Sequence, residues 1–334
     1  MLRVFRHTII LISLLTVGFL FSDSIKMIRS ASAIEMQTVT FAPQWLPQAQ
    51  FAGFYVAYEK GFYKKHGIDL IVMRKESVNS PPELLYRRKV NFTTMFLATA
   101  IPAREKGVKL VNIGQIVQKS GYMLVAKKSQ GIVSLGDLNG KKIALWPTSR
   151  VQADEFFHKF GIKAHVVPQG SSMNLFLRGG VDAASAMWYN EYHTLLNAGL
   201  EEKDITAFFF DQYGLNFPED GIYCLEEFYM HNRLLCCNFA KASLEGWQYA
   251  FDHPKEAINI VMKYVWEANM ATNRTHQEWM LKRMKDLILT GNKTKITGHL
   301  DEADYKQVAM ELQKYRLIKR IPKYGDFYVD CTTD

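Results

Sequence analysis

The sequence has few cysteines and lacks the short motifs that mark common reactions. Its four cysteines, Cys224, Cys236, Cys237 and Cys331, form no C-x-x-C pair and no Cys/His spacing typical of a metal site. It contains no G-x-S-x-G, Walker or H-E-x-x-H motif. These absences leave serine hydrolases, P-loop nucleotidases and zinc peptidases without support, and they predict no metal site.

A long apolar run and a block of like charge are also absent after residue 34. No apolar stretch there approaches the roughly 20 residues that a membrane-spanning helix needs. The formal net charge is +8, but Lys and Arg are scattered among acidic residues. This distribution favours a soluble surface and predicts no nucleic-acid partner.

The N-terminus has the pattern of a signal peptide. Arg3 and Arg6 precede an apolar run at residues 8–21, and Ala31, Ser32 and Ala33 form a small-residue cleavage pattern. We expect residues 1–33 to be removed on export. An uncleaved anchor is the alternative, because charged residues separate the run from the cleavage pattern. About 300 residues would remain, with a net charge near +5, which is enough for two lobes with substantial cores.

The cysteines admit more than one arrangement. Cys236 and Cys237 are adjacent beside a helical pattern, and their simplest role is as small core residues. A disulfide between Cys224 and Cys331 is an option in an oxidising compartment, but the sequence does not decide it.

The stretch at residues 37–73 predicts a strand, a loop, a helix and a second strand. Prolines at 43 and 47 end the first strand, and apolar residues at 51, 54, 55, 58 and 62 form one stripe of a helix. The loop between them carries Trp45, Gln48 and Gln50. Ligands of open α/β sheets bind beyond the carboxyl ends of strands, which is where this loop falls.

Alternation of strands and helices continues to about residue 212. Helices are expected at 81–88 and 98–106, and strands at 89–95, 108–117, 121–126, 143–146, 166–167, 181–187 and 207–211. A Gly/Pro-broken loop follows at 213–221, and the chain from 226 onward is mostly helical. The pattern predicts an α/β fold with mostly parallel sheets and a helical C-terminal region.

Two further loops at strand ends carry polar and aromatic side chains. Thr148 and Ser149 precede a helix whose free amides could hold an anion or a carbonyl oxygen, although an ordinary N-cap is the alternative. The strand that ends near residue 187 runs into Trp188, Tyr189, Asn190 and Glu191.

The opening stretch resembles the NMT1/THI5-like family. The resemblance rests on Trp45, on the run FAGFYVA at 51–57 and on EKGFYKKHGID at 59–69. That family contains periplasmic substrate-binding proteins of ABC transporters for thiamine-pyrimidine precursors, sulfonates and nitrate, and also the eukaryotic thiamine-pyrimidine synthase. The run LNGKKI at 138–143 is similar to the start of the family's second lobe.

The resemblance implies a two-lobed periplasmic-binding-protein-like fold of type II. Lobe one would comprise residues 35–119 plus 213–334, and lobe two residues 120–212. Crossing strands near 119–125 and 207–213 would serve as a hinge that closes around a ligand.

The synthase of that family needs a Lys that holds pyridoxal phosphate and a His four residues later. Met95 and Thr99 occupy those positions here, and a thioether forms no Schiff base. The family's Cys-rich run would fall at residues 213–220, which contain no thiol. We therefore expect no enzyme and no cofactor, and we keep a synthase-like enzyme as an alternative. Glu191 and Asp220 could form a catalytic carboxylate pair, but accepting hydrogen bonds from a ligand is the plainer role.

The predicted site combines flat aromatic faces with polar edges. Its members are Trp45, Gln48, Gln50, Thr94, Thr148, Ser149, Trp188, Tyr189, Asn190, Glu191 and Asp220. Because no Lys or Arg lies in these clusters, a neutral or weakly basic heterocycle related to a thiamine pyrimidine fits better than a sulfonate or nitrate. The resemblance implies a monomer in the periplasm that delivers its ligand to a membrane permease. The sequence also leaves open a sensor that feeds a membrane signalling protein and a secreted structural protein without a ligand.

Overall fold

The structure, a computed structural model, describes residues 36–73, 80–291 and 293–332. The predicted signal peptide at 1–33 lies outside the described residues. From Gln37 onward the chain forms one compact unit. In the described ranges, no helix combines the length and the apolar character that crossing a membrane requires.

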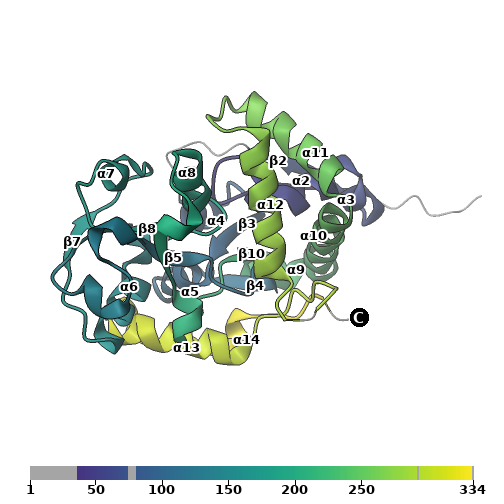
Figure 1. The fold of residues 1–334 in the computed structure, drawn as a ribbon. Coiled ribbons are helices and arrows are strands. Elements are labelled where there is room, and N and C mark those ends of the chain that lie inside the picture. Colours follow the sequence, from purple (N-terminus) through teal and green to yellow (C-terminus); the bar gives the residue numbers. More distant parts are fainter. Residues whose placement is uncertain (1–35, 74–79, 292, 333–334) are drawn as a thin grey trace, which may run out of the picture. The chain divides into compact units, whose positions relative to one another are not determined.

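The first of two five-stranded sheets has the strand order β2-β1-β3-β10-β4 (Figure 1). Its strands are β1 (Gln37–Ala42), β2 (Ile68–Val72), β3 (Phe92–Phe96), β4 (Leu110–Gln115) and β10 (Asp220–Leu225). β1 pairs in parallel with β2 and β3, whereas β10 is antiparallel to both β3 and β4. One late strand is therefore inserted in reverse between strands that share a direction.

The second sheet repeats this plan with the order β7-β6-β8-β5-β9. Its strands are β5 (Tyr122–Lys127), β6 (Lys142–Leu145), β7 (His165–Pro168), β8 (Ala183–Met187) and β9 (Ile205–Phe209). β6 is parallel to β7 and β8, and β5 is antiparallel to β8 and β9. The predicted α/β class with mostly parallel sheets is confirmed, with one reversed strand in each sheet.

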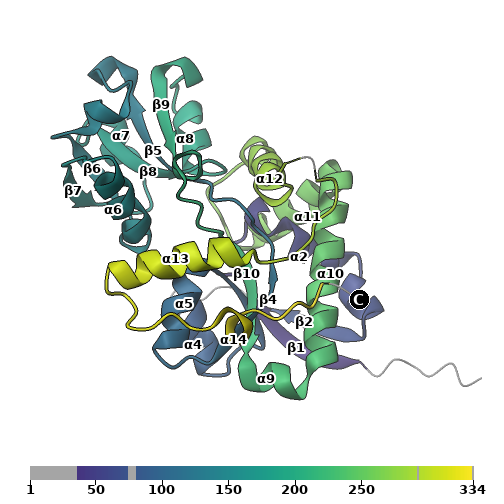
Figure 2. The same cartoon turned by 90° about the horizontal axis from the view of Figure 1, so that it is seen from below.

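Helices cover the sheets and fill the C-terminal third of the chain. The earlier helices are α2 (Ala52–Glu59), α3 (Phe62–Lys65), α4 (Pro81–Tyr86), α5 (Leu97–Glu105), α6 (Arg150–Lys159), α7 (Asn174–Leu177) and α8 (Glu191–Asn197). The later ones are α9 (Glu226–His231), α10 (Arg233–Asp252), α11 (Pro254–Glu267), α12 (Arg274–Ile288), α13 (Glu302–Lys314) and α14 (Tyr324–Phe327). Short 3₁₀ turns include η1 (Ala49–Phe51), η4 (Pro147–Ser149) and η6 (Phe210–Tyr213). α13 packs against two helices, α5, which follows β3 of the first sheet, and α6, which follows β6 of the second sheet (Figure 2).

The single helix expected at 51–62 is two helices, because Gly61 adopts φ = 74° and ends the run between α2 and α3.

α2 lies unusually close to α10. A Cβ at Gly246 would sit 2.1 Å from the carbonyl oxygen of Gly53, so only glycine fits there. This close packing holds η1 and the loop before it against the C-terminal helices.

The chain crosses between the sheets twice, at residues 116–121 and 214–219, and the two crossings run side by side. The Glu219 amide donates to the Val117 carbonyl at 3.3 Å, and the Asn216 side-chain amide donates to the Gln118 carbonyl at 3.0 Å. The loop expected at 213–221 therefore ends earlier than predicted, because Asp220 already begins β10.

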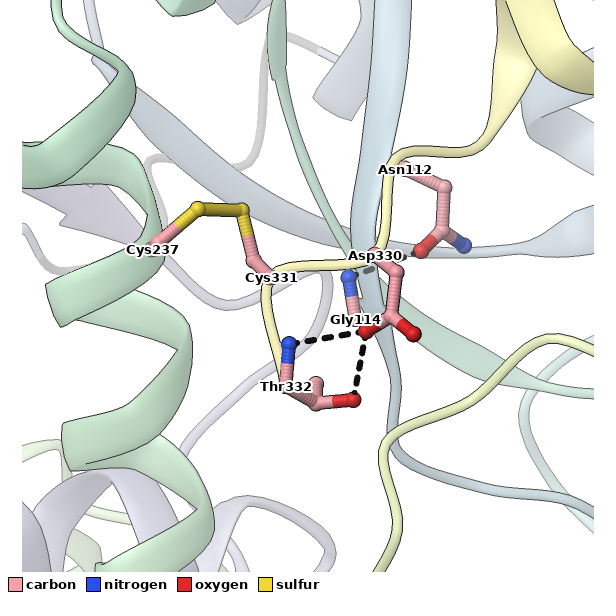
Figure 3. The surroundings of a disulfide bond; sticks show 6 residues. All are labelled: Asn112, Gly114, Cys237, Asp330, Cys331 and Thr332. Carbon is pink, nitrogen blue, oxygen red and sulfur yellow. Dashed lines mark hydrogen bonds between the residues drawn. A yellow bond between two sulfur atoms is a disulfide. The ribbon is translucent and has the colours of Figure 1, made fainter. Parts of the chain in front are cut away.

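The disulfide in this structure joins Cys237 to Cys331, which rules out the Cys224–Cys331 option that the sequence left open (Figure 3). Their Cα atoms are 4.5 Å apart, while Cys224 and Cys236 are buried as free thiols. Consecutive residues of a helix point about 100° apart, so on α10 Cys236 faces the core and Cys237 faces the C-terminal segment. The core role predicted for Cys236 is confirmed, and the one predicted for Cys237 is wrong.

This bond fastens the last described residues beside β4. The Val329 amide donates to the Asn112 carbonyl at 3.0 Å, and the Thr332 amide and hydroxyl both donate to Asp330 (Figure 3). The C-terminal segment is thereby tied to both the sheet and α10.

Replacing both cysteines, as Cys237→Ala with Cys331→Ala, should lower the free energy of unfolding by about 2–4 kcal/mol, because the bond closes a long loop. The two cysteines are 94 residues apart in the sequence. Urea unfolding with and without reductant measures this. Reductant should lower the stability of the wild type to that of the variant and leave the variant unchanged. An equal effect of reductant on both proteins would contradict this role.

Candidate functional site

A buried carboxylate, Asp220, organises the polar residues at the start of β10. Its Oδ2 accepts a hydrogen bond from Nε2 of Gln50 at 2.7 Å, and its Oδ1 accepts one from the side chain of Gln44. The hydroxyl of Thr94 also donates to this carboxylate, and it accepts a hydrogen bond from the backbone N–H of Gln44 at 3.0 Å. Burial raises the pKa of Asp220 to about 7, although these hydrogen bonds oppose the rise.

The structure brings four of the sequence-predicted site residues together here. Gln48 donates to Oε1 of Gln50 at 2.6 Å, which links it through Gln50 to Asp220, and Thr94 completes the group. They converge because β1 and β3 are parallel and end at the same edge, where antiparallel β10 begins. The three segments therefore meet at the carboxyl edge of the first sheet, where ligands of α/β sheets bind.

The neighbouring carboxyl group, Glu219, is a functional candidate that the sequence reasoning missed. Its side chain is 3% exposed, and its Oε1 accepts from the Gly121 amide at 2.6 Å and from the Ser120 hydroxyl at 3.4 Å. Within the described chain, Oε2 is buried without a well-formed hydrogen bond, and the phenol of Tyr189 lies beside the carboxyl group. Burial, and then the charge of Asp220, raise the pKa of Glu219 to about 8. The only sequence signal was a Glu-Asp dipeptide in a Gly/Pro-broken loop.

A small cleft lies where the two sheets meet, next to these carboxyl groups. Both sheets and the end of the helical tail line it. The lining residues are Phe96, Ala98, Ser120, Tyr122, Thr148, Ser149, Val151, Gln152, Met187, Phe217, Pro218, Glu219, Leu312 and Leu317. Among these described residues none is Lys, Arg or His, and Glu219 is the one carboxylate. The cleft suits a small ligand with apolar faces and few polar atoms.

Thr148 and Ser149 lie in the cleft wall at η4, and their role in ligand binding stays a prediction. The alternative role as an ordinary N-cap does not hold in the described structure. Ser149 is the N-cap residue of α6, and its side chain makes no capping hydrogen bond. Its hydroxyl and that of Thr148 are thus available as donors or acceptors.

The predicted cluster at 188–191 mainly faces α12 and does not line the cleft. Trp188 packs under the Arg283 guanidinium at 4.5 Å, and its carbonyl accepts from the indole of Trp279 at 3.0 Å. The side-chain oxygen of Asn190 is 2.9 Å from Nε2 of His276. Roles of Trp188 and Asn190 in ligand binding stay predictions.

Tyr189 and Glu191 of the same cluster have different surroundings. Tyr189 is buried beside Glu219, and this burial raises its pKa well above the ordinary value. Glu191 accepts from the Met187 amide at 3.0 Å and from the side chain of Asn190 at 2.8 Å, and burial raises its pKa. The carboxyl group adjacent to Asp220 is therefore Glu219, and Glu191 is held within its own loop.

Trp45 lies in a separate groove. It is 45% exposed and shares that groove with Tyr55, Tyr58 and Tyr264, on the side where β2 forms the edge of the first sheet. The indole is absent from the described lining of the cleft, so its proposed stacking on a ligand stays a prediction. In the described chain, no group of three or more His, Cys, Asp or Glu side chains is arranged to hold a metal ion.

Comparison with known sequences identifies the family. A sequence model described as NMT1/THI5 like matches residues 48–257. The chain belongs to the NMT1/THI5-like family. A formylaminopyrimidine-binding protein of Halalkalibacterium halodurans is 24% identical over 78% of this chain and 80% of that protein. The riboflavin-binding protein RibY of Chloroflexus aurantiacus is 25% identical over 70% of this chain and 68% of that protein.

Solved structures establish the fold class. The periplasmic aliphatic sulphonate-binding protein SsuA of Escherichia coli aligns with a TM-score of 0.66 at 14% identity, covering 86% of this chain and 91% of that chain. The predicted two-lobed periplasmic-binding-protein-like fold is confirmed. A 4-amino-5-hydroxymethyl-2-methylpyrimidine phosphate synthase of Schizosaccharomyces pombe matches 37% of this chain at 22% identity, over 36% of its own length. The family thus joins binding proteins that match most of the chain to an enzyme that matches a smaller part of it.

The raised pKa values of Glu219 and Asp220 predict how stability depends on pH. Both folded-state values exceed the ordinary values of 4.5 and 3.8, so their contribution is fully present below about pH 4 and is lost as the pH rises to about 8. The free energy of unfolding should therefore fall over this range, and Glu219→Gln should reduce the fall by on the order of 2 kcal/mol.

Urea unfolding at pH 5 and pH 8 measures this difference. Asp137→Asn is a matched control with the opposite sign. That exposed carboxylate has its pKa lowered, first by the Val133 amide, so removing it should not reduce the fall. An identical loss of stability in wild type and Glu219→Gln would show that Glu219 is not buried as described.

Proposed function

We propose that this protein is an exported solute-binding protein of an ABC transporter that captures a small aromatic heterocycle between its two lobes. The observation that carries the proposal is the cleft itself, which contains apolar walls, four hydroxyl-bearing residues and one buried carboxyl group with an oxygen that lacks a well-formed hydrogen bond. The names of two relatives that match most of the chain support it, since one binds formylaminopyrimidine and another riboflavin, both planar heterocycles.

The same lining argues against a sulfonate. A buried anion needs a cation or several converging donors. The described wall offers no Lys, Arg or His, and it places Glu219 with Asp220 behind it. A planar heterocycle needs only apolar faces and a few hydrogen bonds, which Phe96, Tyr122 and Phe217 together with Thr148 and Ser149 supply.

The residues at the positions where the family's synthase has its Lys and His support binding without catalysis. Met95 is fully buried in β3 and has no amine for a Schiff base, and Thr99 lies in α5. Glu219 and Asp220 could move protons, but neither can replace the amine that the synthase needs for its Schiff base. A synthase-like enzyme is therefore the weaker proposal.

We assign the lobes as predicted, with residues 35–119 and 213–334 in one and 120–212 in the other. The crossings at 116–121 and 214–219 would be the hinge between them. The Cys237–Cys331 bond fits an oxidising compartment such as the periplasm, which supports export and delivery to a membrane permease. A sensor for a membrane signalling protein would share the same cleft.

Isothermal titration calorimetry with a panel of ligands tests the proposal. The aminopyrimidine 4-amino-5-hydroxymethyl-2-methylpyrimidine, riboflavin and an alkanesulfonate should be titrated into the purified mature chain. We expect one of the two heterocycles to bind with 1:1 stoichiometry and the sulfonate not to bind. Tight binding of the sulfonate alone would refute the ligand class and leave the fold untouched.

Two single variants locate the bound ring. Phe96→Ala removes an aromatic face from the cleft and should weaken binding about five- to 150-fold, because stacking contributes roughly 1–3 kcal/mol. Trp45→Ala is the matched truncation in the separate groove, at the position the sequence favours. Loss of affinity in Trp45→Ala together with wild-type affinity in Phe96→Ala would move the site to that groove.

A further inference from the structure

The two oxygens of Glu219 have different surroundings. Oε1 accepts from the Gly121 amide at 2.6 Å and from the Ser120 hydroxyl, so it acts as a carbonyl-like acceptor. Oε2 is buried without a well-formed hydrogen bond within the described chain, and the Tyr189 phenol is the side chain that interacts with this carboxyl group besides Ser120. This asymmetry is what a protonated carboxyl group shows when its O–H awaits an acceptor.

Among the described residues that act on the carboxyl group, none carries a positive charge. The groups that face it are Asp220 on β10, Tyr189 after β8, and the Ser120 hydroxyl at the first crossing. Tyr122 of β5 and Gln152 of α6 line the same cleft, and both are uncharged there.

Two lysines close in sequence to cleft residues, Lys119 beside Ser120 and Lys314 near Leu312, are paired with other carboxylates. Lys119 pairs with Asp211 at 2.7 Å, and Lys314 of α13 pairs with Glu155 of α6. A negative charge on Glu219 would therefore be buried beside Asp220 without a counter-ion, which disfavours ionisation. The pKa of about 8 agrees with this arrangement.

We propose that Glu219 recognises the ligand as a neutral carboxylic acid, with its Oε2–H donating a hydrogen bond to a ring nitrogen or carbonyl oxygen of the heterocycle. This inference rests on the proposed function and names the chemistry of the same site. The ligand class is then an azine or related ring that presents an unprotonated acceptor toward β10, with Thr148 and Ser149 available to its opposite edge.

The pH dependence of affinity follows directly. Because the ligand binds the protonated acid, affinity is constant below about pH 8 and falls by up to about tenfold for each further pH unit. An ionised acceptor at Glu219 would give the opposite slope, since affinity would rise with pH.

Three variants distinguish a neutral hydrogen-bond donor at position 219 from a negatively charged acceptor there. Glu219→Leu removes the donor and should weaken binding about five- to 150-fold at pH 7, because the buried ligand acceptor is left unpaired. Glu219→Gln supplies an N–H donor in the same place, so it should restore binding relative to Glu219→Leu and abolish the fall above pH 8. Asp304→Asn is the matched control. Burial also raises the pKa of Asp304, but this carboxyl group accepts a hydrogen bond from Asn216 and does not line the cleft. This variant should keep the wild-type pH profile.

The experiment pairs calorimetry with a measurement that needs no ligand. Affinity for 4-amino-5-hydroxymethyl-2-methylpyrimidine and for riboflavin is measured from pH 6 to pH 10 on all four proteins. Infrared difference spectra of the ligand-free wild type and Glu219→Gln then report the C=O stretch of a protonated carboxyl group at pH 7. We expect a band lost in Glu219→Gln and a pH profile that is flattened in both Glu219 variants and unchanged in Asp304→Asn.

The possible failures are distinct. Absence of the infrared band, or an unchanged pH profile in Glu219→Gln, overturns the neutral-acid role while the proposed function stands on wild-type binding. A band without binding of either heterocycle contradicts the proposed ligand class and, with it, the donor's assigned partner. Circular dichroism melts show whether Glu219→Leu is folded, and Glu219→Gln keeps the inference testable if it is not.

Discussion

Two adjacent carboxyl groups buried at the start of one strand are the constraint around which this site is built. Asp220 and Glu219 are 1% and 3% exposed, and burial of such groups without cations is unfavourable unless they are protonated or well hydrogen-bonded. Asp220 is satisfied by two glutamine side chains and the Thr94 hydroxyl, whereas Glu219 retains an oxygen without a good partner. The network therefore fixes the loop after β1, and the proposed ligand would supply a partner for the remaining oxygen of Glu219.

The reversed strand β10 explains why these groups lie where they do. Strands β1 and β3 end at the edge where β10 begins, so one position collects residues from three distant segments. The same residues end the second crossing, and Glu219 accepts a hydrogen bond from Gly121 at the end of the first crossing. The carboxyl edge of the first sheet and the connection between the two sheets are consequently linked through a single side chain.

The sequence predicted the α/β class, most strands and the loop that carries Gln48 and Gln50, because these depend on local periodicity and on prolines and glycines. It failed for β10, since the apolar run at 221–225 is short and follows a Gly/Pro-rich loop that hides its start. Glu219 was missed because its importance comes from burial and from the Gly121 amide, 98 residues away in sequence. The sequence left the cysteine pairing undecided and gave Cys237 a core role for the same reason, since the direction of a side chain on α10 depends on how that helix packs.

Trp45 and Glu219 show that the residue favoured by the sequence pattern differs from the one that packing places beside the cleft. An indole after the first strand is the residue that the family resemblance emphasises, yet here it lies in a groove with Tyr55 and Tyr264. The buried carboxyl group and the cleft aromatics provide a separate, more enclosed environment at the junction of the sheets. Both cannot be the primary contact of one small ring.

A crystal structure of the mature protein grown with an aminopyrimidine or riboflavin tests the central claim most directly. The account predicts ligand density in the cleft between the sheets, with a ring nitrogen or carbonyl oxygen within hydrogen-bond distance of Glu219 Oε2. Density confined to the groove at Trp45, with the cleft filled only by water, would contradict it.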